Sequence, residues 1–175
     1  MIKNRLFRHF YVLFGVVLLC SFVFFRSSKE IDLEQNELAY SDTKITLNFG
    51  GIEELIPSEK QVFRSDVYLS DINLNDAGFY SKEQVVMLLS NQMLSSRFVN
   101  GNYSIVPEFQ SGETGVKAKL LSLNGSETDI EVVSGTVEYE GTYPQVHLTF
   151  DFLLSNGEKL RGSYFKKMQS FKYYF

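Results

Sequence analysis

One stretch near the end of the sequence constrains the fold more than any other. Apolar and polar residues alternate from Val146 to Leu154, which is the pattern of a strand with one buried face. Asn156-Gly157 follows, and this dipeptide between two alternating segments is typical of a tight hairpin turn. The second arm of the predicted hairpin covers 160–165. The pattern therefore predicts an antiparallel pair of strands at this point.

Further short strands are predicted along the rest of the chain. The segment 85–89 also fits a helix, because Ser81 and Gln84 match a capping box, but its β-branched start and short length favour a strand. The predicted strands cover 44–49, 62–69, 85–89, 103–106, 116–123, 128–133, 135–140, 146–154, 160–165 and 171–175. About eight to ten strands without a βαβ rhythm predict an all-β fold, an antiparallel β-sandwich or small barrel.

A long apolar run near the start predicts a contact with the membrane. Phe10–Phe25 holds no charged residue, and it is slightly shorter than the roughly 20 residues of a bilayer-spanning helix. No small-residue cleavage pattern follows the run. We expect an uncleaved signal anchor that forms one N-terminal membrane helix. A cleaved signal peptide and a lipoprotein modified at Cys20 are the alternatives. The anchor residues expected to contact lipid are Phe10, Leu13, Val17, Leu19 and Phe25.

The distribution of charge predicts the orientation of this segment. Lys3, Arg5 and Arg8 precede the apolar run, and all 21 acidic residues follow Arg26. The positive-inside rule therefore leaves the N-terminus in the cytoplasm and exports the remainder to the periplasm or the exterior. The predicted organisation is an anchor or signal peptide over 1–26, a polar tether over 27–42 and a β-sandwich domain over 43–175.

Composition excludes several classes of function for the exported part. Its acidic surplus argues against nucleic acid, which requires a basic face. Cys20 is the only cysteine, and His9 and His147 are the only histidines, so neither a zinc site nor a Ser-His-Asp triad is indicated. His147 is interpreted as a surface residue of its strand. We expect no cofactor, no enzymatic activity and a monomeric domain.

One segment has the composition of a weak calcium site. Asp71, Asn73, Asn75 and Asp76 place oxygen ligands at close spacing, as hard cations require. An EF-hand loop would have glycine where Asp76 stands and a glutamate six residues later, and the sequence has neither. An irregular calcium site and a solvated turn are the two interpretations of this segment.

The order of several strand and turn motifs resembles exported β-sandwich domains of Bacteroidota. The motifs are the apolar strand 85–89, Asn-Gly-Asn-Tyr-Ser-Ile at 100–105, Val-Ser-Gly-Thr-Val-Glu-Tyr at 133–139 and the hairpin 146–164. Many of those proteins are lipoproteins, whereas Leu19 precedes Cys20 here in place of a small residue. The resemblance covers about half of the chain. It implies a cell-envelope β-sandwich and assigns no catalytic residue.

These observations predict a non-enzymatic, membrane-tethered protein of the cell envelope with a binding or structural role. Its expected partners are the lipid bilayer and an envelope protein or glycan, which we expect to contact the loops 73–80 and 110–115. A lipocalin-like carrier of an apolar ligand is the first alternative. An outer-membrane β-barrel is the second, because aromatic residues are frequent in the tail after Tyr164.

Overall fold

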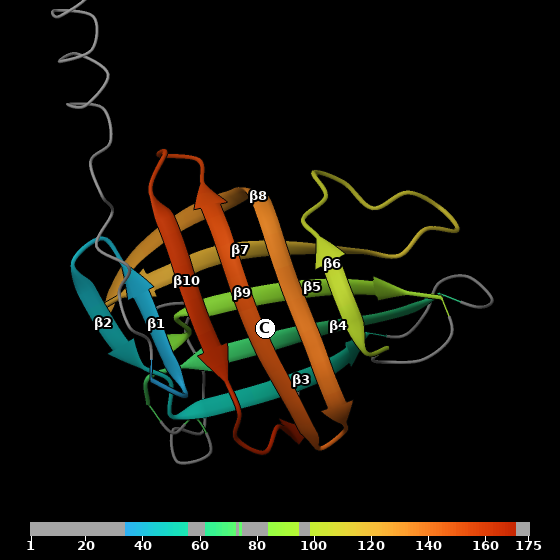
Figure 1. The fold of residues 1–175 in the computed structure, drawn as a ribbon, viewed down its shortest axis with the longest axis horizontal. Coiled ribbons are helices and arrows are strands. Elements are labelled where there is room, and N and C mark those ends of the chain that lie inside the picture. The colour runs from blue at the N-terminus through green and yellow to red at the C-terminus, as the bar shows by residue number, and fades with distance from the viewer. Residues whose placement is uncertain (1–33, 56–61, 73, 75–83, 95–98, 171–175) are drawn as a thin grey trace, which may run out of the picture. The chain divides into compact units, whose positions relative to one another are not determined.

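A computed structural model of the chain separates it into two compact units, Met1–Asp32 and Leu33–Phe175. The structure describes residues 34–55, 62–72, 74, 84–94 and 99–170, all within the second unit. These residues form strands and connecting segments and contain no α-helix (Figure 1). The predicted all-β class is confirmed for this part of the chain. None of its described segments is a helix long and apolar enough to span a bilayer.

The described strands form one sheet of eleven strands. They are β1 (Glu37–Tyr40), β2 (Thr43–Thr46), β3 (Phe49–Leu55), β4 (Phe63–Ser70), β5 (Met87–Met93), β6 (Gly101–Ser104), β7 (Gly115–Leu123), β8 (Ser126–Thr142), β9 (Gln145–Leu154), β10 (Lys159–Tyr164) and β11 (Gln169–Ser170). Their order is β11-β3-β4-β5-β7-β8-β9-β10-β1-β2, and β6 pairs with β8 beside this path. β11 pairs with β3 in parallel, so the sheet is mixed, whereas the sequence predicted an antiparallel one.

β8 connects the two halves of this sheet. Its first part pairs with β7 and its second part with β9 and β6, with a register shift between Val132 and Ser134. Gly135 follows with a φ of 130°, and a Cβ there would overlap the backbone oxygen of Asp151. The sheet curls at this bend, so that β8–β10 cross in front of β3–β5 and β7 in Figure 1. The predicted strands 128–133 and 135–140 are therefore a single bent strand.

The hydrophobic core lies between these two layers. The inward face of β9 is buried at every second residue from Val146 to Leu154, as the alternation predicted. Tyr139, Phe152 and Tyr164 are the largest of the buried side chains in a cluster that includes residues of both layers. Burial of a large apolar side chain stabilises a fold by about 1.5–3 kcal/mol. The contact between the layers is thus the main source of stability.

A polar contact fixes the two layers against each other within this core. The Tyr139 hydroxyl of β8 donates to Asn91 Oδ1 of β5 at 2.5 Å, and Asn91 Nδ2 donates to the Ser65 carbonyl at 3.4 Å. Burial raises the pKa of the Tyr139 hydroxyl, since its ionised form would lose its hydration. Both side chains are buried, so separation of the layers would leave polar groups without partners.

Two boundaries predicted from the sequence are wrong. The polar tether predicted over 27–42 extends too far, because β1 pairs with β10 and β2 and belongs to the sheet. Gly50 and Gly51 do not end a strand but lie inside β3. A Cβ at Gly50 would overlap the ring of Tyr164, so glycine is required there for close packing rather than for a turn. The strand predicted over 171–175 lies outside the described residues.

Candidate functional site

The candidate site lies where β8 diverges from β7. The pairing between these strands starts at Lys119 and Glu131 and extends away from the bend, so the first residues of β7 have no partner on β8. The segment after β6 takes that place. The Val106 N–H donates to the Val116 carbonyl at 2.9 Å, and the Ile105 N–H donates to the Gly135 carbonyl at 3.0 Å. The divergence leaves a hollow on the outer face of the sheet, which we name the corner pit.

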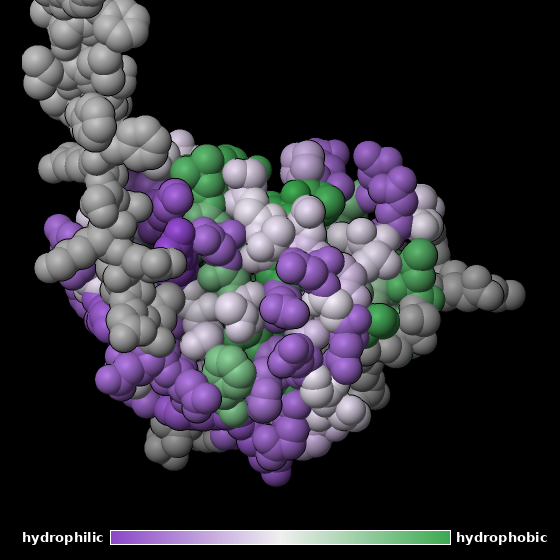
Figure 2. Space-filling model, in the orientation of Figure 1, coloured by the Kyte–Doolittle hydropathy of each residue, from purple (hydrophilic) through white to green (hydrophobic). Residues whose placement is uncertain are grey.

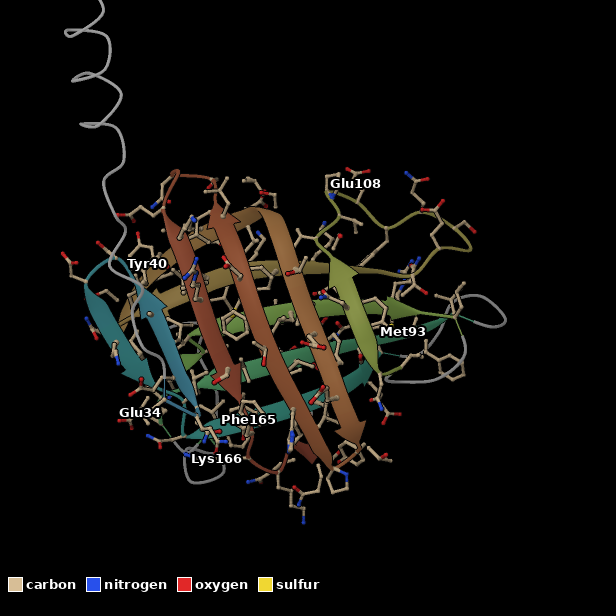
Figure 3. The ribbon with its side chains drawn as sticks, viewed as in Figure 1. Glu34, Tyr40, Met93, Glu108, Phe165 and Lys166 are labelled. Atoms are coloured by element: carbon tan, nitrogen blue, oxygen red, sulfur yellow. The ribbon has the colours of Figure 1, made fainter. Side chains whose placement is uncertain are left out.

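The corner pit has a volume of about 470 Å³ and is open to solvent. This volume falls within the roughly 300–1,000 Å³ of pockets that bind small molecules. Strands β5 and β7 line the pit with Leu88, Ser90, Lys117, Ala118 and Lys119. β8 contributes Glu131, Val132 and Val133, and the loop after β6 contributes residues 106–109. The residues come from three strands and one loop that are distant in sequence. Figure 3 shows Glu108 on this loop, beyond the end of β6.

The loop wall of the corner pit is fixed to the sheet by Gln92 of β5. Its side-chain Nε2 donates to the carbonyls of Gln110 and Glu113 at 2.6 and 2.8 Å. Its Oε1 accepts from Nε and Nη2 of Arg64 at 3.3 and 3.2 Å. Gln92 is only 2% exposed, so these bonds satisfy an amide that water does not reach. The wall is therefore preformed.

Packing at both ends of this loop supports the same conclusion. A Cβ at Gly115 would lie 2.8 Å from Cγ2 of Val106, so glycine permits the loop to return close to its own start. The Phe109 ring has Arg64 Cζ at 6.0 Å and Lys117 Nζ at 5.9 Å from its centroid. Each cation–π contact of this kind contributes about 0.5–1 kcal/mol at an exposed site. The aromatic ring is thereby held at the wall of the pit.

The charged side chains of the pit balance one another. Lys119 Nζ lies 3.2 Å from Glu131 Oε1 and 3.5 Å from Asp129 Oδ1. The hydrogen bond to Glu131 and the nearby carboxylate charges raise the pKa of Lys119. Among the described residues, Lys117 makes no ion pair, and its ammonium faces the Phe109 ring. With Glu108, the lining contains two lysines and two glutamates.

A row of polar side chains continues from the pit across the outer face. The strand register aligns Glu53 with Asp66, Asp66 with Ser90, and Ser90 with Lys117. Burial raises the pKa of the Asp66 carboxyl, a hydrogen bond from Ser90 opposes the shift, and the charge of Glu53 adds to it. Ser90 also lines the pit, so a ligand there would contact the Ser90 hydroxyl. This hydroxyl is the group that is hydrogen-bonded to the Asp66 carboxylate.

Of the calcium ligands, anchor residues and lipidation site proposed from the sequence, the structure describes only Asp71, which does not line the pit. The Asp71 carbonyl accepts a hydrogen bond from Asn48 Nδ2 at 2.7 Å, whereas Asn73, Asn75 and Asp76 lie outside the described residues. The described ranges contain no group of three or more His, Cys, Asp or Glu side chains placed to bind a metal. The predicted anchor residues Phe10, Leu13, Val17, Leu19 and Phe25, and Cys20, also lie outside the described residues.

Of the other regions singled out from the sequence, the loop 110–115 lies close to the pit and His147 lies on the opposite layer. The predicted contact loop 110–115 supports the wall through its bonds to Gln92, whereas most of the loop 73–80 lies outside the described residues. His147 is partly exposed on β9, with its ring centroid 4.8 Å from that of Phe165, as expected of a surface strand residue.

The pit residues had only a partial signal in the sequence. The alternation from Val116 to Leu120 predicts that Lys117 and Lys119 share the outer face. It does not predict that β8 turns away beside them, because that depends on the bend at Gly135. The role of Gln92 depends on two carbonyl groups of a distant loop and has no local signature.

Comparison with known proteins adds no further assignment. No protein-family model, curated protein or solved structure matches the chain. The resemblance to exported Bacteroidota β-sandwich domains therefore stays a prediction, and the functional argument rests on the pit itself.

Proposed function

We propose that the chain is a non-enzymatic β-sandwich protein of the cell envelope that is tethered to the membrane by its N-terminal helix. In this proposal the exported domain binds an envelope glycan or protein in the corner pit. The observation that carries the proposal is the preformed loop wall, which Gln92 fixes with hydrogen bonds of 2.6 and 2.8 Å. A preformed site binds with little loss of conformational entropy.

An exposed apolar residue at the rim also supports binding at this place. Val133 is 53% exposed, more than any other large apolar residue in the described part of the chain. It lines the pit together with its neighbours Glu131 and Val132 on β8. An apolar side chain beside a concave polar surface gains stability when a ligand covers it.

The packing of large side chains between the layers favours this proposal over an apolar carrier. A carrier requires a cavity inside the sheet, and the side chains of Tyr139, Phe152 and Tyr164 occupy the region between the layers. The polar side chains that line the pit lie on the outside of the sheet, so they suit a ligand that approaches from solvent rather than one held between the layers.

Photo-crosslinking in the cell that produces the chain tests the binding proposal. A diazirine amino acid in place of Val133 is expected to capture an envelope component, whereas the same group in place of Thr149 is the control. Thr149 is exposed on β9, in the front layer. Capture at Thr149 but not at Val133 would contradict the proposal, because the contact surface would then lie elsewhere.

A fractionation experiment tests the tether. The full chain is expected to remain in the membrane pellet after alkaline carbonate extraction and to be digested by protease added from the exported side. Release of the full chain into the carbonate supernatant would contradict the retained helix. A mature N-terminus at or beyond residue 20, found by mass spectrometry, would establish a cleaved or lipidated form instead.

A further inference from the structure

We infer that the ligand of the corner pit is a neutral oligosaccharide. This inference rests on the proposed function and specifies the chemical class of the partner. Three features of the pit support it: its largely paired strand edges, its balanced charge and its aromatic wall.

Much of the strand edge around the pit is already paired and offers little room to an extended peptide. Peptides commonly bind by adding a strand to a free sheet edge. Here the edge of β7 is occupied by β8 from Lys119 onward and by Val106 near Val116. β8 is paired with β9 beyond the bend, and the Ser155 N–H donates to the Glu131 carbonyl at 2.8 Å. These pairings favour a ligand that binds mainly through side chains.

The charge of the lining favours a neutral ligand. Lys117 and Lys119 are balanced by Glu108 and Glu131, and Lys119 is already 3.2 Å from the Glu131 carboxylate. An anionic ligand would compete with these carboxylates, and a cationic ligand would meet both lysines. Sugar hydroxyl groups both donate and accept hydrogen bonds, so ammonium and carboxylate groups in one site can bind them together. Ser90 adds a further hydroxyl to the lining.

The apolar surfaces of the pit match the C–H faces of sugar rings. Phe109 and Pro107 from the loop and the exposed Val133 from β8 all line the pit. Arg64 Cζ and Lys117 Nζ lie 6.0 and 5.9 Å from the centroid of the Phe109 ring, and these contacts favour its position at the wall. Polar groups in the pit and apolar groups at its sides therefore suit a ligand with alternating hydroxyl and C–H surfaces.

Binding measurements on the full chain in phospholipid nanodiscs test this inference, since sugar-based detergents would compete for the site. A printed array of neutral and acidic oligosaccharides identifies ligands. Titration calorimetry then compares maltohexaose, cellohexaose, chitohexaose and any array ligand with the acidic hexagalacturonate. We expect at least one neutral oligosaccharide to bind. Its dissociation constant should change less than about twofold between about 50 and about 500 mM NaCl, because neutral ligands are not screened.

Two variants locate the binding site. Phe109→Ala is expected to weaken binding about tenfold or more, equivalent to about 1.4 kcal/mol. Phe165→Ala is the matched control, since Phe165 is also a partly exposed phenylalanine but contacts His147 on the other layer. Lys117→Met keeps the length of the side chain and should weaken a neutral ligand only about threefold, the loss of a single hydrogen bond.

Three results would overturn the inference: exclusive binding of acidic oligosaccharides, an affinity that falls about tenfold with salt, or an unchanged affinity in Phe109→Ala. A lack of any saccharide binding would also overturn it. In that case capture of a protein by the Val133 crosslinker would leave the proposed function in place, whereas absence of capture there would remove both.

Discussion

The two layers of the sheet differ in how continuously their strands are paired. In the front layer, β9 pairs with β8 along ten residue pairs and with β10 along six, and Figure 2 shows a mostly hydrophilic face with scattered hydrophobic residues. In the back layer, the residues of β7 before Lys119 have no partner on β8, and a loop held by Gln92 fills part of the gap. Nearly continuous pairing holds the strands of the front layer side by side, whereas the gap between β7 and β8 leaves a hollow that a ligand can occupy.

The strongest test of this comparison changes the bend that separates the layers. Gly135→Ala should lower the free energy of unfolding by about 3 kcal/mol or more, because the φ of 130° is strained for alanine and its Cβ would overlap Asp151. Gly157→Ala is the matched control. Gly157 also has a positive φ, 85°, but no atom lies within 4 Å of its Cβ position, so the expected loss is about 1 kcal/mol.

Thermal unfolding of the full chain in nanodiscs, followed by near-ultraviolet circular dichroism, measures both losses. Equal destabilisation by the two substitutions would show that the packing at the bend contributes nothing beyond backbone strain. The explanation of the pit by a glycine-dependent bend would then be wrong.

The second-largest expected loss of stability comes from removing the side chain that holds the loop wall of the pit. Gln92→Ala removes a buried amide and leaves the carbonyls of Gln110 and Glu113 without their donor, which should cost about 1–3 kcal/mol. Amide hydrogen exchange over 105–114 should become faster, while exchange in β9 stays unchanged. Gln145→Ala, at an exposed position of β9, should change stability by less than about 0.5 kcal/mol. Unchanged exchange in the loop would contradict the fixed wall.

A pH-dependent effect tests how the layers meet. Tyr164 of β10 lies against Gly50 of β3, and burial raises the pKa of its hydroxyl to about 12. In the unfolded chain this group ionises near pH 10. The stability linked to its neutral form is therefore complete below pH 10 and is lost as pH rises through about 12.

We therefore expect the wild-type chain to lose about 1 kcal/mol relative to Tyr164→Phe between about pH 9 and about pH 11. Melting temperatures of both forms across this range measure the difference. A constant difference between the two forms would show that the Tyr164 hydroxyl is in contact with water and does not seal the junction of the layers.

The smallest expected effect is on the front layer. Arg161 Nε lies 2.9 Å from Asp151 Oδ2 across β10 and β9, with both side chains substantially exposed. Arg161→Ala should therefore change the free energy of unfolding by less than about 1 kcal/mol. Lys119→Ala, at the ion pair of the pit, provides the comparison and should have a similarly small effect on stability. A loss above about 2 kcal/mol for Arg161→Ala would contradict the description of this face as tolerant.

Local sequence patterns predicted the elements whose partners are close in the chain. The hairpin of β9 and β10 follows from alternation around Asn156-Gly157, and the residue pairs from Leu153–Lys159 to Leu148–Tyr164 agree with it. The segment 85–89 was predicted to be a strand rather than a helix. This is confirmed for residues 87–89, because β5 starts at Met87. These segments were predictable since their periodicity and their turn are contained within a few residues.

Elements that depend on distant partners were predicted poorly. β1 was assigned to a tether, because its four residues have little pattern of their own and are ordered by pairing with β10. The predicted strand 44–49 ends before Gly50 and Gly51, because the ring of Tyr164 that requires a small residue at Gly50 comes from a distant strand and leaves no local pattern. The corner pit combines both difficulties, as its lining comes from three strands and a loop.

The sequence alone determined that the part of the chain after the apolar run consists of strands and which face of the regular strands points inward, because a period of two is a local property. It also determined the acidic composition and the apolar run from Phe10 to Phe25. Only the tertiary structure decided that β8 passes from one layer to the other, that Gln92 holds a distant loop and that a pit opens between them. These features arise from hydrogen bonds and close packing between residues far apart in the chain, which no local pattern encodes.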